Sequence, residues 1–160
     1  MPPSLLDRLL DGPFELAAQP EPLAGDLRPA WGIALLVLIL GRSRGKRATL
    51  QKLHFLAHSA RTREARQQAH RVFTGVLRPA DLVVRVEPWL NRAIALAKGY
   101  GFVEFEGGRG AKLTDRGLDL LKEIEATTAV LLEEKAFLDA VGGLATEGRI
   151  EKIMRMELLL

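Results

Sequence analysis

The sequence contains no cysteine among its 160 residues, which excludes disulfide bonds and thiolate metal sites. A chain without cysteine fits a reducing compartment, so we expect a cytoplasmic protein. Aromatic residues are scarce at 6%, and none of the three serines stands in the turn that surrounds a nucleophilic serine. The balance of 48% hydrophobic and 27% charged residues is typical of a soluble globular domain and excludes a disordered tail, a fibre and a coiled-coil rod.

Long hydrophobic runs are also missing. The most apolar stretch covers residues 30–41, and as a helix it spans about 18 Å, well short of the ~30 Å hydrocarbon core of a membrane. The N-terminus carries acids where a signal peptide requires a basic start. Basic residues after the stretch leave a membrane-surface anchor as an alternative, but a fully buried helix has the same pattern, and we expect no membrane partner.

The net charge of +3 conceals a strongly basic block. Residues 42–78 hold ten Lys and Arg and a single acid, Glu64, whereas the remainder holds 13 basic and 19 acidic residues. Such a block attracts phosphates without reading sequence, although a solvated surface or a docking face for an acidic protein has the same composition. The residues that we expect to contact a DNA backbone are Arg42, Arg44, Lys46, Arg47, Arg63, Arg66 and Arg71.

The N-terminal half predicts helices. Residues 1–29 hold several prolines and glycines after a short amphipathic turn and form an irregular arm. An apolar helix follows over 30–40, with Gly41 ending it. Thr49 caps a second helix, with Leu50 and Leu53 facing inward, and a third helix runs over about 62–73. The turn at 42–47 and the third helix flank one short helix, so we expect them to lie near each other.

The C-terminal half mixes strands and helices. Residues 81–86 (DLVVRV) predict a short strand, and Pro88 begins a helix over 88–99 with an apolar stripe from Trp89 to Ala97. Residues 102–114 alternate around a glycine-rich tip and predict a β-hairpin. Thr114 starts a long helix that reaches Val141, and a last helix follows Thr146. The helix and hairpin faces should be buried together, through Trp89, Leu90, Ile94, Val103, Phe105 and Leu113.

This order predicts a mostly α protein with a small β-hairpin (α+β), a winged helix-turn-helix in residues 30–124 with a C-terminal helical extension in 125–160. The helix 88–99 takes the position of a recognition helix, the hairpin that of the wing, and the strand at 82–86 pairs with the hairpin. Another α+β domain with one hairpin is the alternative. The side chains expected on the recognition helix and wing are Asn91, Arg92, Lys98, Arg109 and Lys112.

Residues 81–124 resemble the winged-helix middle components of bacterial ABC-three-component systems, the Lamassu-type anti-phage operons. The matching residues are 84–88 (VRVEP), 90–93 (LNRA), 113–114 (LT) and 116–117 (RG), and the earlier 34–36 (ALL) and 50–54 (LQKLH) also fit. The resemblance implies a non-enzymatic subunit that bridges an SMC-like ATPase and an effector such as a nuclease. It implies no catalytic residues.

Terminal helices with apolar residues on several faces indicate a partner surface. The predicted interface residues are Leu131, Leu132, Phe137, Leu138, Ile150, Ile153, Met154 and Leu158. The alternative is that this tail folds back on its own domain.

Little in the sequence points to catalysis. His54 and His58 lie four residues apart but lack a third ligand, and Phe55 stands where a zincin requires glutamate. The glycines at 107–110 lead into a strand and not into a helix, so they form a turn and not a phosphate loop. We therefore expect no enzyme, cofactor, metal or small-molecule substrate. Two functions remain: the bridging subunit with sequence-independent DNA contact, and a homodimeric winged-helix transcription regulator.

Overall fold

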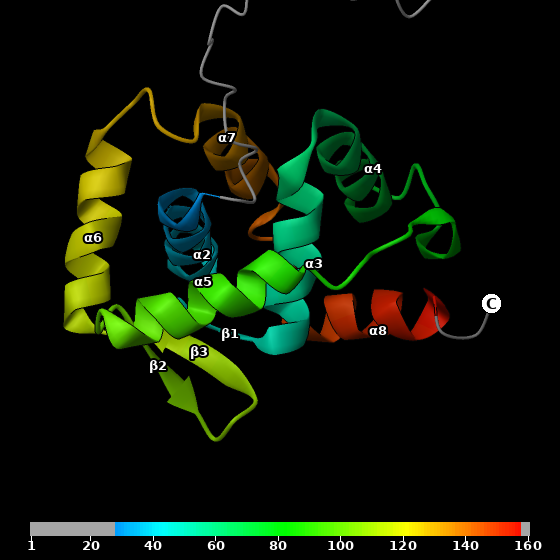
Figure 1. Cartoon of the computed structure of the whole chain (residues 1–160). Coiled ribbons are helices and arrows are strands. Elements are labelled where there is room, and N and C mark those ends of the chain that lie inside the picture. Colours follow the sequence, from blue (N-terminus) through cyan, green and yellow to red (C-terminus); the bar gives the residue numbers. More distant parts are fainter. Residues whose placement is uncertain (1–27, 158–160) are drawn as a thin grey trace, which may run out of the picture.

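The computed structural model describes residues 28–157, with the side chains of the last two left out, so most of the predicted arm and Leu158 lie outside the described residues. Helices make up most of it, beside one small sheet (Figure 1). In chain order the elements are α2 (Pro29–Arg42), the 3₁₀ turn η2 (Arg44–Lys46), β1 (Arg47–Thr49), α3 (Leu50–Arg61), α4 (Arg63–Phe73), the 3₁₀ turn η3 (Pro79–Asp81), α5 (Pro88–Gly99), β2 (Val103–Glu106), β3 (Gly110–Leu113), α6 (Asp115–Ala126), α7 (Leu132–Val141) and α8 (Glu147–Glu157).

The apolar helix α2 forms the centre of the protein. Residues 35–40 are fully buried, and α3, α5, α6 and α7 pack around the helix (Figure 1). A helix that is apolar on all sides needs cover on all sides, so α2 dictates the surrounding layer. The predicted buried helix is confirmed. Within residues 28–157 no helix combines the length and the apolar character that crossing a bilayer requires.

The sheet has three antiparallel strands in the order β1-β3-β2. The predicted hairpin is confirmed, with Gly107 and Gly108 at positive φ in its turn. The prediction of a strand at 82–86 is wrong: the chain is irregular there, and β1 supplies the third strand. Both edges of β3 are occupied by β1 and β2, and Val83 and Val86 of the 82–86 segment are 62% and 68% exposed. Its β-branched residues therefore have no sheet to join.

The long helix predicted over 115–141 is interrupted. Helix α6 ends at Ala126, and Leu131, at φ 53°, turns the chain back before α7. Threonines are weak helix formers, which explains a break at Thr127 and Thr128. Lys135 Nζ then donates to the carbonyls of Ile124 and Thr127 and fixes the turn.

This reversal places α7 against α2, α3 and α4, and α8 against α3 and η3. Of the predicted partner interface, Phe137, Leu138, Ile150 and Ile153 are at most 6% exposed and belong to the chain's own core. The prediction that they form a partner surface is therefore wrong, and the alternative that the tail folds back describes them. Leu131 and Met154 are partly buried against the same core, and Leu132, at 66%, is the one exposed residue of the described set.

Helix α5 and the hairpin share the predicted core. Trp89, Leu90, Ile94, Val103 and Leu113 are all buried. Phe105 was predicted with them, but it is 39% exposed, because it stands near the turn of the hairpin, away from the core end at Val103 and Leu113. Lys98 Nζ lies over its ring, 5.1 Å from the centroid.

Candidate nucleic-acid interface

The turn between α2 and β1 and the tip of the hairpin form one basic groove. It has a volume of about 630 Å³ and is lined by Arg44, Arg47 and Arg109 together with Glu106 and Glu147. Pairing of β1 with β3 creates it, because this ladder sets Arg47 opposite Lys112 and Thr49 opposite Gly110. Gly110 is required there, since a Cβ would approach the carbonyl oxygen of Ala48 to 2.5 Å. We call this the hairpin groove.

Acidic residues on the hairpin neutralise part of the positive charge in and around the hairpin groove. Glu104 faces Lys112 across the β2–β3 ladder, and a Glu106 carboxylate oxygen lies 3.5 Å from the Arg47 guanidinium. Arg44 and Arg109, by contrast, are exposed and have no ion pair within the described residues. Within the hairpin groove these two arginines are the cations left to meet an external anion.

Two predicted DNA-contact residues are engaged inside the chain. Arg42 pairs with Glu125 of α6 and Asp139 of α7, and the bond to Glu125 raises its pKa above the ordinary value despite a desolvation cost. Arg66 pairs with Glu133 and donates to the carbonyl of Ala60. Each guanidinium thus joins helices of the fold, and its contact with a DNA backbone stays a prediction.

The remaining arginines of α4 lie far from the hairpin groove. Helix α3 separates them, and its 12 residues extend about 18 Å. The expectation that the turn at 42–47 lies near α4 is therefore wrong: they occupy opposite ends of α3 (Figure 1).

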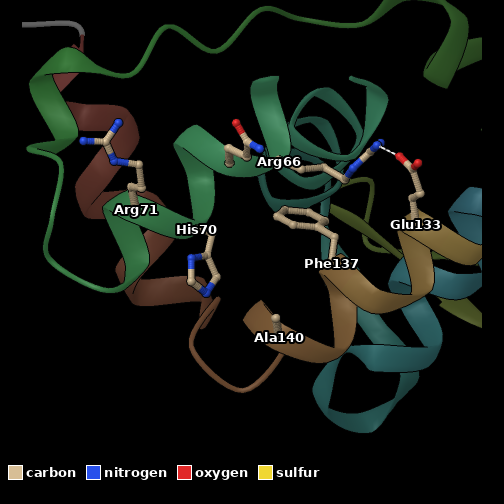
Figure 2. Close-up of a pocket in the computed structure, with 7 residues that line it drawn as sticks. Arg66, His70, Arg71, Glu133, Phe137 and Ala140 are labelled. Carbon is tan, nitrogen blue, oxygen red and sulfur yellow. Dashed lines mark hydrogen bonds and ion pairs between the residues drawn. The ribbon is translucent and has the colours of Figure 1, made fainter. Parts of the chain in front are cut away.

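Arg63 and Arg71 of α4 are exposed, and Arg71 borders a pocket of about 400 Å³ between α4 and α7. Figure 2 shows the Arg66–Glu133 pair bridging this pocket over Phe137, while Arg71 extends away from it. The α4 arginines thus form a second basic group, separate from the hairpin groove.

The outward face of α5 carries few long polar side chains. Asn91, Arg92 and Lys98 are exposed, as is Ala95 between them. Asn91 hydrogen-bonds the side chain of His54, and Arg92 lies beside Arg28 at the start of α2. Lys98 alone of the three is next to the hairpin. Direct readout of bases requires several reaching donors, and α5 does not offer them.

A buried carboxylate fixes α5 against α3. Glu87, 3% exposed, accepts hydrogen bonds from His58 Nδ1 at 2.7 Å, Trp89 Nε1 at 2.8 Å and Arg61 at 3.3 Å. Its backbone N–H donates to His54 Nδ1 over 3.3 Å. The two predicted candidate metal ligands, His54 and His58, are thus used in this network. Within the described part of the chain no group of three residues could hold a metal ion.

Sequence reasoning missed an apolar groove of about 650 Å³ between α2, α5 and α6. Its lining is Pro29, Ala30, Ile33, Ala34, Leu96, Tyr100, Phe102, Leu120 and Ile124. Tyr100 is 56% exposed and stacks on Phe102, with ring centroids 5.8 Å apart. These residues have the spacing of core stripes, so only the packing reveals that they border an open groove. We call it the apolar groove.

Comparison of the chain with family models, with curated proteins and with solved structures found no match in any of the three.

Proposed function

We propose that this protein is a winged-helix subunit without catalytic activity. Three features support the winged-helix assignment: β1 follows the first described helix, the hairpin follows α5, and the strands take the order β1-β3-β2. In this assignment α5 has the position of a recognition helix and β2–β3 is the wing.

The observation that carries the functional proposal is the presence of two grooves of opposite character. The hairpin groove is lined by arginines and the apolar groove by aliphatic and aromatic side chains, and the two share no residue. A subunit that bridges partners needs separate surfaces of this kind. We propose that the apolar groove receives apolar side chains of a protein partner, and that the hairpin groove meets nucleic acid.

Contact with DNA is proposed to be independent of sequence. Arg44 and Arg109 are suited to phosphates, whereas α5 presents a small alanine where a reader of bases would present a long side chain. The partner assignment rests on the resemblance to the middle components of Lamassu-type anti-phage systems. On this resemblance the proposed partners are an SMC-like ATPase and an effector subunit. The proposed location is the cytoplasm.

Fluorescence anisotropy on two unrelated duplexes over a salt series tests the DNA contact. We expect weak, similar affinities that fall steeply with salt, by a slope of roughly −0.9 per neutralised phosphate. Changing Arg44 and Arg109 to Glu should abolish binding, because both cations line the hairpin groove. The matched control changes Arg63 and Arg71 to Glu, two exposed arginines of α4 that do not line the hairpin groove.

Two outcomes contradict the proposal. Tight binding to one duplex alone would favour the homodimeric regulator. If the Arg63 and Arg71 variant lost DNA binding while the Arg44 and Arg109 variant retained it, the DNA contact would lie on α4.

A further inference from the structure

A further cleft lies beside the basic turn and has a largely buried lysine in its lining. It has a volume of about 850 Å³ and is bounded by the turn at 41–47, by Lys52 of α3 and by the α7–α8 connection at 142–148. Chain segments remote in sequence meet here, because α8 packs against α3 beside β1. Its volume is within the range of small-molecule sites.

Lys52 is the unusual member of this lining. The residue is 5% exposed, and its ammonium has no hydrogen bond or ion pair within the described residues. Because no buried side-chain nitrogen in this part of the chain lacks a partner, the ammonium itself is accessible from the cleft. Burial lowers the pKa of Lys52, and the charge of Glu147 only partly opposes that effect. Lys52 is therefore a largely buried residue whose ammonium is open to the cleft and paired only by solvent. An anion in the cleft would supply the missing partner.

Backbone donors face the same cleft. The 11-residue helix α8 begins there, and Thr146 satisfies the N–H groups of Arg149 and Ile150. The N–H groups of Glu147 and Gly148 find no acceptor in residues 28–157. Free N–H groups at a helix start favour an anion. A Cβ at Gly143 or Gly148 would meet nothing within 4 Å, so a ligand has room to approach the backbone.

The charges in the cleft favour an anion despite one acid. Besides Lys52 the lining includes Arg44, Lys46 and Arg47. Glu147 is the single carboxylate among the lining residues, and it already accepts hydrogen bonds from Thr49 N at 3.2 Å and Thr49 Oγ1 at 2.7 Å. Arg42 also borders the cleft but pairs with Glu125 and Asp139.

We infer that this cleft binds the terminal phosphate of a small molecule, and that Lys52 and the first N–H groups of α8 donate hydrogen bonds to the phosphate oxygens. A terminal phosphate presents three oxygens and can satisfy the lysine and the backbone donors together. A phosphodiester within a duplex is flanked by sugars on both sides and reaches a recessed ammonium poorly. This inference goes beyond the proposed DNA contact, because neither Lys52 nor α8 Gly148 lines the hairpin groove.

Isothermal titration calorimetry with inorganic phosphate and pyrophosphate tests the site. We expect a dissociation constant of about a millimolar or tighter, at least a tenfold loss in Lys52→Met, and tighter binding in Glu147→Gln, which removes the opposing charge but keeps an acceptor for Thr49. Lys122→Met is the matched control, because Lys122 is exposed on α6 away from the cleft and should leave binding unchanged.

Thermal melts establish that each variant folds, and NMR titration of the Lys52 ammonium gives a reading that does not depend on the variants. Pyrophosphate should raise the pKa of Lys52 toward that of an exposed lysine. The inference is overturned by absence of binding, by equal affinity in Lys52→Met, or by an unmoved Lys52 titration. Displacement of pyrophosphate by a duplex with hydroxyl ends would overturn the assignment to a small ligand. Arg109→Glu alone tests the DNA proposal separately, because Arg109 lines the hairpin groove and not this cleft, whereas Arg44 lines both.

Discussion

The Glu87 carboxylate accepts a hydrogen bond of 2.7 Å from His58 Nδ1, and this contact joins the start of α5 to α3. The orientation of α5 relative to the hairpin depends on this junction, since Glu87 also accepts the Trp89 indole N–H two residues later.

Removal of the carboxylate should therefore destabilise the fold. Glu87→Ala leaves the Trp89 N–H unpaired in the core, and we expect a loss of about 3 kcal/mol in the free energy of unfolding. Urea unfolding measures it. Glu104→Ala, on the exposed side of the hairpin, is the control, with an expected change within about 0.5 kcal/mol. Equal effects of the two substitutions would contradict the role of Glu87.

Stability should fall below neutral pH because of His54. Burial lowers the pKa of His54 below 6.5, and this outweighs the hydrogen bond to Asn91 and the charge of Glu87. The unfolded chain therefore takes up this proton at a higher pH than the folded chain, and stability is lost as pH falls below about 6.5. His54→Asn keeps an acceptor for the Glu87 N–H and removes the titration.

Melting temperatures of both proteins between pH 8 and pH 5 measure this difference. The wild-type chain should lose more stability across about pH 6.5 than the His54→Asn chain. Parallel curves would show that His54 does not contribute.

Gly117 should tolerate no side chain. A Cβ at this position in α6 would overlap the carbonyl oxygen of Phe102, which is backbone and cannot move aside cheaply. We expect Gly117→Ala to cost more than about 2 kcal/mol. Gly99→Ala is the matched control, because a Cβ there meets nothing within 4 Å, and it should be neutral or stabilising by up to about 1 kcal/mol. A neutral Gly117→Ala would contradict the packing of α6 on the hairpin.

The apolar groove, and not the terminal helices, should carry the protein contact. Tyr100→Glu places a charge at the edge of the groove, whereas Leu132→Glu does the same on α7, where the side chain is 66% exposed. We expect co-purification with the products of neighbouring genes to weaken in the first variant alone. If co-purification weakened only in Leu132→Glu, the partner interface would lie on α7.

Local signals made much of the fold predictable. Thr49, Thr62 and Thr114 each accept a bond from a backbone N–H three residues on, and these caps place three helix starts where the sequence puts them. The prediction of a strand at 82–86 was wrong because β propensity does not specify a pairing partner. The three-residue strand β1 forms instead, because it pairs with the free edge of β3.

The candidate sites depend on long-range contacts that no local pattern encodes. Arg42 and Arg66 look like exposed cations in the sequence, but their acids arrive from α6 and α7, far along the chain. Lys52 lies between apolar residues of α3, and the cleft that it lines exists only because the start of α8 packs beside it. The break at Thr127 decides both, since an unbroken helix would have carried α7 and α8 away from the core.

Sedimentation velocity on the chain, alone and with the products of the adjacent genes, tests the bridging role most directly. The account predicts a monomer that enters a hetero-complex through the apolar groove, and loses it in Tyr100→Glu. A stable homodimer that ignores those gene products and protects a single operator sequence would contradict it.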